Sequence, residues 1–293
     1  MPLSPDPLPD LQVIRNHRSR VGESPVWDGH AGVIRWCDID GQRLLSATLT
    51  GDILSDEPFD GPVGAIAMAG PGRVIMAIGN RVVLYDLAAA RQTIIAEVPL
   101  AIGERLNDGK VGPDGTFWIG AINSQEVAAR KSGLYRVTAD GRVEQKLRGL
   151  GISNGLAFSP DSRRMYHADT FTGEIVTYTF DPETGNLGEK TPFAWLTRTD
   201  GLPDGGICDR AGNYWSAGVT ANCLNCISPA GRLMRTVPLP VEAPTSVCFA
   251  GPDLDQMVVT SLKRPQTSDP RDGQTMVLAP GVGGLPAYEF QLS

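Results

Sequence analysis

The sequence predicts an all-β fold, a six-bladed β-propeller with four-stranded antiparallel blades around a central channel. Short turns rich in Gly, Pro and Asp recur along the chain, and each is followed by a run of aromatic and β-branched residues typical of a strand. Counted from these turns, equivalent positions recur at intervals of 41, 43, 47, 50 and 41 residues. Intervals of this size are those of one propeller blade. The six equivalent positions are Glu23, Gly64, Asn107, Asn154, Asp204 and Thr245.

Each repeat is expected to begin with an inner strand that carries the equivalent position. The turns that end these inner strands are expected at 28–32, 69–72, 112–115, 159–162, 209–212 and 250–253. The next strands are expected at 33–36, 74–77, 117–120, 165–168, 214–217 and 257–260. Strands of a second hairpin are expected at 81–85, 133–137 and 175–180. Helical solenoids share this period, but the sequence lacks the long helical apolar stripes that they require.

The length and composition fit one domain. The chain has 293 residues, 34 of them Gly and 23 Pro, and 41% are hydrophobic. All-β closed folds routinely use this length as a single domain, and the Gly and Pro content suits many tight turns. We therefore expect one propeller domain over 1–293, with 1–10 as a flexible, Pro-rich leader.

The charge of the chain argues against some classes of partner. The net charge is −7 and the pI is about 5.0, without a basic run, so nucleic acid and anionic membranes are poor partners. The apolar runs are too short to span a bilayer, and the N-terminus lacks the pattern of a signal peptide. A cytoplasmic protein is expected, in an oligomeric state that the sequence leaves open.

The cysteines and histidines give little support to nucleophilic catalysis. Cys223 and Cys226 form a C-x-x-C pair, typical of half a zinc site or a redox pair, but no second pair accompanies it. Structural thiols are therefore expected. The three histidines, His17, His30 and His167, fall outside the equivalent positions, which argues against Ser-His-Asp or Cys-His chemistry in the channel.

Four of the six equivalent positions carry oxygen atoms suited to a metal ion. Glu23 and Asp204 are carboxylates, and Asn107 and Asn154 supply amide oxygens. Equivalent positions of a propeller converge on its axis, where two carboxylates would raise each other's pKa unless a divalent cation bound them. Asn and Asp before Gly also form ordinary turns, but four such residues in register favour a metal pocket. Calcium, magnesium, manganese and iron(II) stay open, and the lack of His and Cys disfavours zinc.

Several motifs, in order along nearly the whole chain, resemble one family. They are Gly-Glu-Ser-Pro-Val-Trp at 22–27, Arg-Leu-Asn-Asp-Gly-Lys-Val at 105–111, Pro-Asp-Gly-Thr-Phe-Trp-Ile-Gly at 113–120 and Ser-Asn-Gly-Leu-Ala-Phe-Ser-Pro-Asp at 153–161. The family is that of gluconolactonase, regucalcin (senescence marker protein) and luciferin-regenerating enzyme. This resemblance implies a six-bladed propeller that holds one divalent metal ion and hydrolyses sugar lactones to aldonic acids. Calcium becomes the first expectation for the ion, with zinc, magnesium, manganese and iron(II) as alternatives.

The resemblance also implies roles for individual residues. Glu23, Asn154 and Asp204 match the metal ligands of the family. Asn107 matches a residue beside the metal that contacts substrate or a bound water, and Arg105 matches a residue that binds a substrate hydroxyl. A small-molecule sugar lactone is accordingly the expected partner.

The hypothesis for the mechanism is a lactone carbonyl polarised by the metal and attacked by water, with Asp204 accepting the water proton. Asp108 is the second candidate for this base, or it contacts substrate or orients Asn107. A metal-binding propeller without turnover and an esterase or phosphotriesterase that uses the same pocket stay open as alternatives.

Three further expectations concern the edges of the fold. The run 121–125 departs from the Thr-Met pair and acidic residue of many relatives, so the resemblance does not define the substrate preference. The segment 262–266 is expected to border the channel mouth and to add positive charge there. The family often closes its ring with an N-terminal strand, and 11–14 is expected to pair with 288–292, which would remove open sheet edges.

Overall fold

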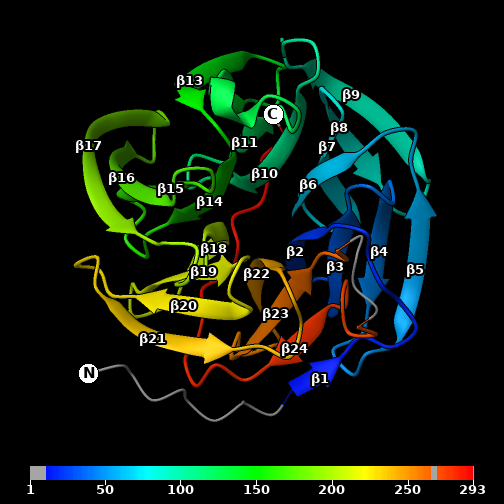
Figure 1. Ribbon diagram of the computed structural model, residues 1–293. Coiled ribbons are helices and arrows are strands. Elements are labelled where there is room, and N and C mark those ends of the chain that lie inside the picture. Colours follow the sequence, from blue (N-terminus) through cyan, green and yellow to red (C-terminus); the bar gives the residue numbers. More distant parts are fainter. Residues whose placement is uncertain (1–10, 265–268, 293) are drawn as a thin grey trace.

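The protein is a six-bladed β-propeller, as the sequence predicts. The computed structural model describes residues 11–264 and 269–292, so the leader expected at 1–10 lies outside the described residues. Six four-stranded antiparallel sheets are arranged around a centre (Figure 1). Over the described part of the chain, the helical structure is limited to a short 3-10 turn, η1 (Val127–Ala129).

The strands of each blade follow one another from the channel outward. The inner strands are β2 (Gly22–Asp28), β6 (Val63–Met68), β10 (Arg105–Val111), β14 (Ser153–Phe158), β18 (Pro203–Cys208) and β22 (Pro244–Ala250). The second strands are β3 (Val33–Asp38), β7 (Arg73–Ile78), β11 (Phe117–Ile122), β15 (Arg164–Asp169), β19 (Tyr214–Gly218) and β23 (Gln256–Ser261). The third strands are β4 (Arg43–Ala47), β8 (Arg81–Asp86), β12 (Ser132–Val137), β16 (Glu174–Asp181), β20 (Cys223–Ile227) and β24 (Met276–Leu278). The outer strands are β5 (Ile53–Pro58), β9 (Arg91–Glu97), β13 (Val143–Leu150), β17 (Asn186–Trp195), β21 (Leu233–Pro238) and β1 (Leu11–Val13).

The ring is closed by a different pair of segments from the one expected. β1 supplies the outer strand of the sixth blade and pairs with β24, with Leu11 opposite Leu278 and Val13 opposite Met276. The expected pairing of 11–14 with 288–292 is wrong, because the backbone of that C-terminal segment bonds elsewhere. The pairing with β1 still covers the edge of β24, so the open sheet edge is removed as expected.

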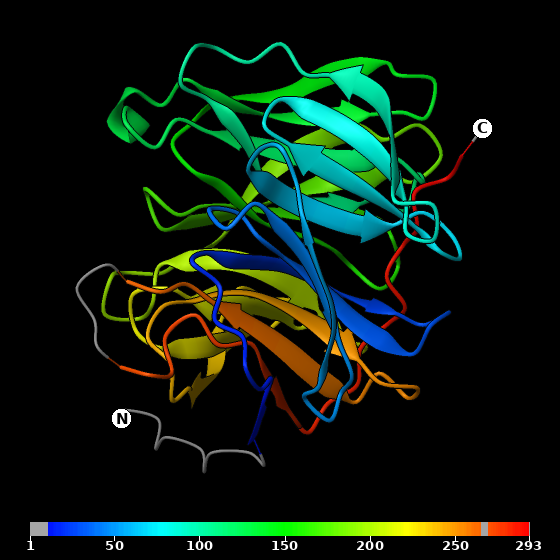
Figure 2. The same cartoon turned by 90° about the vertical axis from the view of Figure 1, so that its right-hand side faces the viewer.

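The C-terminal strap, which we define as 283–291, crosses one face of the ring instead (red in Figure 2). It forms a hydrogen bond with every blade, in each case at the turn after the inner strand or at the last residue of that strand. The partners are Arg210 with Gly283, Leu254 with Gly284, Ser162 with Tyr288, His30 with Glu289, Met68 with Phe290 and Gly115 with Gln291. The strap therefore ties the six blades together across the channel.

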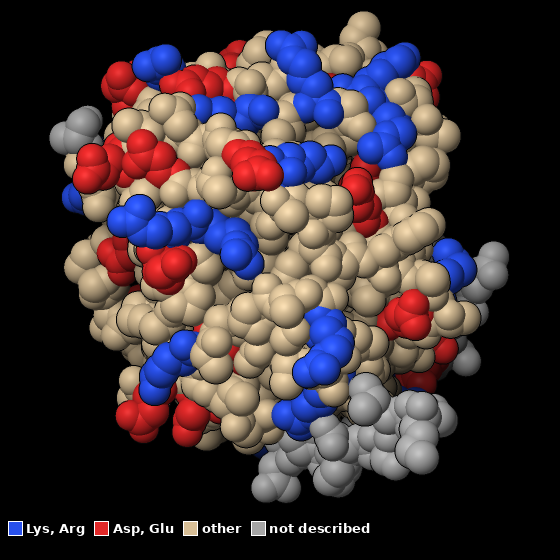
Figure 3. Space-filling model, turned by 90° about the vertical axis from the view of Figure 1, so that its left-hand side faces the viewer, with Lys and Arg blue, Asp and Glu red and all other residues tan. Residues whose placement is uncertain are grey.

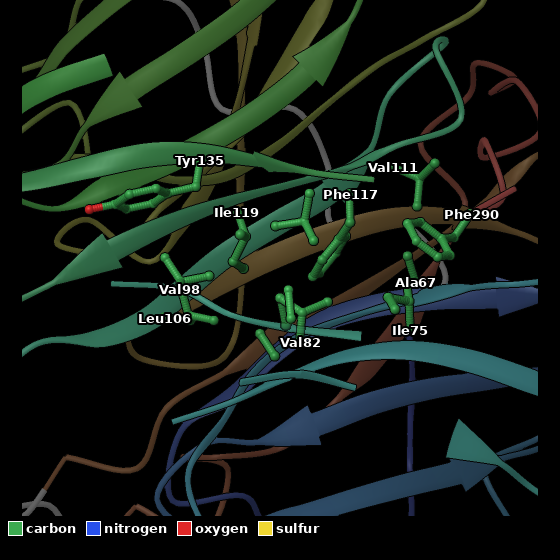
Figure 4. Close-up of a cluster of buried hydrophobic side chains, with 14 of the residues drawn as sticks. Ala67, Ile75, Val82, Val98, Leu106, Val111, Phe117, Ile119, Tyr135 and Phe290 are labelled. Carbon is green, nitrogen blue, oxygen red and sulfur yellow. The ribbon is translucent and has the colours of Figure 1, made fainter. Parts of the chain in front are cut away.

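Apolar side chains fill the spaces between blades. Figure 4 shows one such cluster, in which Val82 and Ile75 of the second blade meet Phe117 and Ile119 of the third. Phe290 of the strap is part of the same cluster and only 2% exposed. The blade contacts and the strap therefore share one core.

Three buried tryptophans, Trp36, Trp118 and Trp215, lie on the second strands of alternate blades. The indole N–H of Trp118 donates to Asp114 and that of Trp215 donates to Asp209, at 3.2 and 3.0 Å. Both aspartates belong to the turns that made the repeats visible. A buried indole needs such an acceptor, so these turn residues have a structural role in addition to shaping the backbone.

Acidic and basic side chains are interspersed on the face of the molecule in Figure 3. No helix in the described ranges has the length and apolar character needed to cross a membrane. The cytoplasmic location stays a prediction.

Candidate functional site

Each inner strand bulges where the equivalent position of the repeat lies. In all six inner strands, one extra residue shifts the register with the second strand at this point, between Glu23 and Val26 in β2 and between Asn154 and Ala157 in β14, for example. A bulge re-aims a side chain and bends its strand. The six bulges therefore explain how the side chains at the equivalent positions come together at one end of the channel.

Three carboxylates are buried together at this end. Glu23, Asp108 and Asp204 have exposed fractions of 6%, 2% and 7% and come from three different inner strands. Burial, together with the charge of Asp108, raises the pKa of Glu23 from 4.5 to about 8. Burial and then Glu23 raise the pKa of Asp204 well above its ordinary value. Without a bound cation, the site therefore favours protonated carboxyl groups at neutral pH.

A directional chain of hydrogen bonds runs beside the carboxylates. Arg105 donates from Nη1 to Oδ1 of Asn107, and Asn107 donates from Nδ2 to Oδ1 of Asn154, both at 2.8 Å. Asn154 then donates from Nδ2 to Oγ1 of Thr170 at 2.8 Å, and Thr170 donates to the carbonyl oxygen of Pro203 at 2.6 Å. The chain links three blades and ends next to Asp204.

This network orients the two amides. The nitrogen of Asn154 is held by Thr170, so its oxygen points the other way, and that oxygen keeps a second lone pair after accepting from Asn107. Thr170 lies just after β15, outside the equivalent positions, and was not among the predicted site residues. The only available signal was its place at the end of the Tyr-His-Ala-Asp-Thr run, where a second strand reaches the channel mouth.

Asp108 does not orient Asn107 as one of its expected roles required. Its Oδ2 accepts from the backbone N–H of Leu156 at 3.2 Å, whereas Arg105 contacts the side chain of Asn107. Burial raises the pKa of Asp108, and the charge of Lys110 opposes this. Asp108 thus ties β10 to β14, and its charge acts on both Glu23 and Asp204.

The remaining two equivalent positions are occupied by residues that serve the backbone. A Cβ at Gly64 would lie 2.4 Å from the carbonyl oxygen of Leu106, so only glycine lets β6 and β10 approach this closely. Thr245 donates its hydroxyl to the carbonyl oxygen of Gly22 at 2.5 Å. The polar side chains thus occupy only part of the ring.

The donor set fits a hard divalent cation. Oδ1 of Asp204 and Oδ1 of Asp108 are buried without a hydrogen-bond partner, which is costly for a carboxylate unless a cation binds it. Glu23 and Asp204, with the amide oxygen of Asn154, provide carboxylate and carbonyl oxygens of the kind that calcium and magnesium prefer. Among the described residues, no group of three or more His, Cys, Asp and Glu side chains could hold a metal. A site here therefore depends on an amide ligand.

Of the histidines and cysteines, Cys37 lies next to the site, because it pairs with Glu23 between β2 and β3 and its Sγ is 3.3 Å from the carbonyl oxygen of Glu23. His167 is buried and its pKa is lowered to about 4 by burial, while His30 pairs with Glu289 of the strap. All five cysteines are free and buried. Cys223 and Cys226 lie three residues apart on one strand, so they project to opposite faces of the sheet and cannot share a metal ion. The expectation of structural thiols is confirmed.

One serine-histidine pair was not anticipated from the sequence. The run 151–155 has the G-x-S-x-G spacing, and Oγ of Ser153 lies 2.9 Å from Nε2 of His167. Ser153 is completely buried, and it begins a strand rather than the strand-to-helix turn that exposes a nucleophile. The pair therefore packs β14 against β15 and has no access to a substrate.

The segments 121–125 and 262–266, singled out in the sequence, make contacts within the protein where the structure describes them. Asn123, within the run 121–125, caps a local turn by accepting from the N–H groups of Gln125 and Glu126. Arg264 approaches Glu242 at 3.9 Å and donates to the carbonyl oxygen of Val219, which partly neutralises its charge. Positions 265 and 266 of the expected basic segment lie outside the described residues.

Residues 21–263 match the model of the SMP-30/gluconolactonase/LRE-like region, which spans all six inner strands. The chain belongs to this family. Regucalcin of Gallus gallus is 28% identical over 96% of the chain and 98% of the relative. The 6-deoxy-6-sulfogluconolactonase of Pseudomonas putida is 32% identical over 88% of the chain and 89% of the relative. The solved structure of a calcium-binding protein, regucalcin, from Agrobacterium tumefaciens superposes with a TM-score of 0.90 at 26% identity, covering 96% of this chain and 97% of that one.

Proposed function

We propose that this protein is a metal-dependent lactonase that opens sugar lactones to the corresponding aldonic acids. The observation that carries the proposal is the buried pair Glu23 and Asp204, whose raised pKa values and unpartnered oxygen call for a cation beside a row of hydrogen-bonding side chains. Membership of a family that includes gluconolactonases supports the reaction type. The similar regucalcin of Agrobacterium tumefaciens is a calcium-binding protein, which supports calcium as the first candidate ion.

Glu23, Asn154 and Asp204 would hold the ion, which when bound supplies a Lewis acid for the lactone carbonyl. Arg105 and Asn107 offer N–H donors and an amide oxygen that can hold sugar hydroxyls. Arg105 is half-buried and already fixed against Asn107, so it loses little freedom when substrate binds.

Asp204 is the proposed base. It is a buried carboxylate with one unpartnered oxygen, so it can accept the proton of a water molecule held beside it. It takes a proton from the attacking water as the water oxygen bonds to the carbonyl carbon. The bond from that carbon to the ring oxygen then breaks, and the ring oxygen receives the proton as a hydroxyl. Asp108 is the less favoured base, because its Oδ2 is held by the backbone of β14.

The test combines variants with a panel of lactones and ions. We expect Asp204→Ala to lose hydrolysis of aldonolactones but still to show a cooperative thermal unfolding transition. The control Asp253→Ala, in an exposed turn, should keep full activity. Glucono-lactone and 6-deoxy-6-sulfogluconolactone should be compared, with calcium, magnesium, manganese, zinc and iron(II) added back after chelation. Full activity of Asp204→Ala would refute the mechanism, and rates indifferent to chelator would refute the role of a metal.

A calcium-binding role without turnover is the second candidate, favoured by the similarity to the calcium-binding regucalcin of Agrobacterium tumefaciens. It predicts that ion binding needs both Glu23 and Asp204. It also predicts that no lactone of the panel releases acid. Preference for aryl esters or phosphotriesters over sugar lactones would instead indicate an esterase that uses the same pocket.

A further inference from the structure

A cavity lies at the opposite end of the channel from the carboxylates. It has a volume of about 640 Å³, and all six inner strands and the C-terminal strap line it. We call it the lower chamber. Its wall residues include Val26, Ile66, Val111, Phe158, Ile207 and Phe249. The strap forms the floor through Leu285, Pro286 and Ala287. A volume of this size is typical of a small-molecule site.

One cation enters this largely apolar space. Lys110 lines the lower chamber and is only half-exposed. Its side chain forms no hydrogen bond or ion pair with any residue in the described ranges. Burial raises the pKa of Cys208 and Cys248, which line the chamber on β18 and β22, and the charge of Lys110 partly offsets this effect.

Several other polar groups that line the chamber are already paired. Ser24 donates its hydroxyl to the carbonyl oxygen of Ile66 and accepts from the N–H of the same residue. His30 is bound to Glu289, and the hydroxyl of Tyr288 to that of Ser162. The charge of Lys110 acts through space on Asp108 and Glu23, but no hydrogen bond or ion pair within the described ranges fixes its ammonium group, so the group is free to receive an anion in the chamber.

We propose that the lower chamber binds a small amphipathic carboxylate, such as a medium-chain fatty acid, with its carboxylate on Lys110 and its hydrocarbon chain against the apolar walls. A carboxylate would pair with the ammonium group in a charge-assisted hydrogen bond. A short hydrocarbon chain would contact the six strands and the floor of the strap, replacing water on apolar surface. A sugar acid fits poorly, because the walls offer few free groups for its hydroxyls.

The strap explains why this chamber exists as an enclosed site. Its hydrogen bonds reach every blade, so the floor is held across the channel rather than lying loosely over it. The lining also includes Gly29 and Pro252, which belong to the turns after β2 and β22.

Calorimetric titration of the metal-loaded protein with sodium decanoate tests the proposal. We expect saturable binding of one decanoate by the native chain, weakened about tenfold or more in Lys110→Met, as expected when a buried charge-assisted bond is lost. Lys110→Arg should stay within about threefold of the native chain, and so should the control Lys190→Met, which removes an exposed lysine on β17. Binding of the uncharged 1-decanol should differ little between the native chain and Lys110→Met.

The proposal would be overturned if decanoate did not bind saturably to the native chain, or if Lys110→Met bound decanoate as tightly as the native chain. Equal losses for decanol and decanoate in Lys110→Met would also overturn it, because the cation would then not recognise the carboxylate. Thermal unfolding checks each variant, and Lys110→Gln replaces the Met variant if that one is unstable. These titrations need no turnover, so they are independent of the proposed lactonase activity.

Discussion

Asn107 on β10 donates a 2.8 Å hydrogen bond to Asn154 on β14, so two neighbouring blades meet at the site through an amide-to-amide contact. Both residues are buried, with exposed fractions of 8% and 4%. The bond is one link in the chain from Arg105 to Pro203, and it leaves the oxygen of Asn154 with one free lone pair. The orientation of the Asn154 oxygen, which we propose as a metal ligand, therefore depends on Asn107 and Thr170.

Replacing Asn107 tests this link. Asn107→Ala leaves Oδ1 of Asn154 without its donor, and an unsatisfied buried group costs about 1–3 kcal/mol, whereas Nη1 of Arg105 keeps its bond to the carbonyl oxygen of Leu106. We expect kcat/KM for a sugar lactone to fall by roughly ten- to a hundredfold. Steady-state kinetics at saturating metal measures the effect, with Asn186→Ala on the outer strand β17 as the control. An unchanged kcat/KM would show that the contact is structural only.

Thr170 is expected to act on metal affinity through Asn154. Thr170→Val keeps the shape of the side chain but removes the hydroxyl that accepts from Asn154 and donates to Pro203. Outer partners of metal ligands typically contribute about ten- to a hundredfold in affinity. We therefore expect weaker calcium binding by calorimetry, with kcat largely restored when calcium is raised. Thr170→Ser keeps the hydroxyl and should bind calcium like the native chain; equal weakening in both variants would contradict the role of the hydroxyl.

The blades were predictable because their signals are local. Turn residues and strand composition recur at short range, as in the second hairpin strands at Arg81–Asp86 and Glu174–Asp181, which lie where they were expected. Ring closure was not predictable in the same way. The pairing of Leu11 with Leu278 and the path of the strap depend on contacts between distant segments, and neither the three-residue β24 nor the strap has a distinctive sequence pattern.

In the site, too, the residues with a local sequence signal were predictable and the contacts between distant segments were not. Glu23, Asn107, Asn154 and Asp204 were found because their positions recur with the repeat, and the structure brings them to one end of the channel. The bulges that aim them are an effect of strand pairing. The hydroxyl of Thr170 and the backbone contact of Asp108 arise between blades, so no spacing along the chain could indicate them.

Glu23 should make the metal-free protein less stable as the pH rises. Its pKa is 4.5 in an ordinary setting and about 8 in the folded site, through burial and the charge of Asp108. Below pH 4.5 the residue is protonated in both states. Between 4.5 and 8 the unfolded chain releases a proton that the folded chain keeps, so the unfolding free energy falls with pH.

We therefore expect Glu23→Gln to unfold at a higher temperature than the native chain in chelator, with a gap that widens from pH 5 to pH 8. Calcium should reverse the order, because it stabilises only a folded state that binds it. Thermal scans across this pH range with and without calcium measure both effects. A gap that does not change with pH would mean that Glu23 is not a buried acid in the metal-free state.

Gly64→Ala tests whether the close approach of β6 and β10 requires glycine at this equivalent position. The added Cβ would lie 2.4 Å from the carbonyl oxygen of Leu106, so β6 and β10 would have to separate. Overpacking of this kind costs about 1–3 kcal/mol, which urea unfolding would detect as a lower midpoint. The control is Gly29→Ala, where the nearest atom to the new Cβ is 3.6 Å away. Equal stability of the two variants would show that the inner strands can shift without cost.

His167 should account for part of the stability lost in mild acid. Burial lowers its pKa from 6.5 to about 4, so above pH 6.5 the ring is neutral in both states. As the pH falls from 6.5 towards 4, the unfolded chain gains a proton that the folded chain excludes, and stability is lost, by about 3 kcal/mol at most. His167→Gln removes this titration and should flatten the pH dependence of the unfolding free energy in that window. The comparison is His30→Gln, whose side chain is 42% exposed in the native chain. If His167→Gln lost stability with the same slope as the native chain between pH 6.5 and 4, the buried neutral ring would not be the cause.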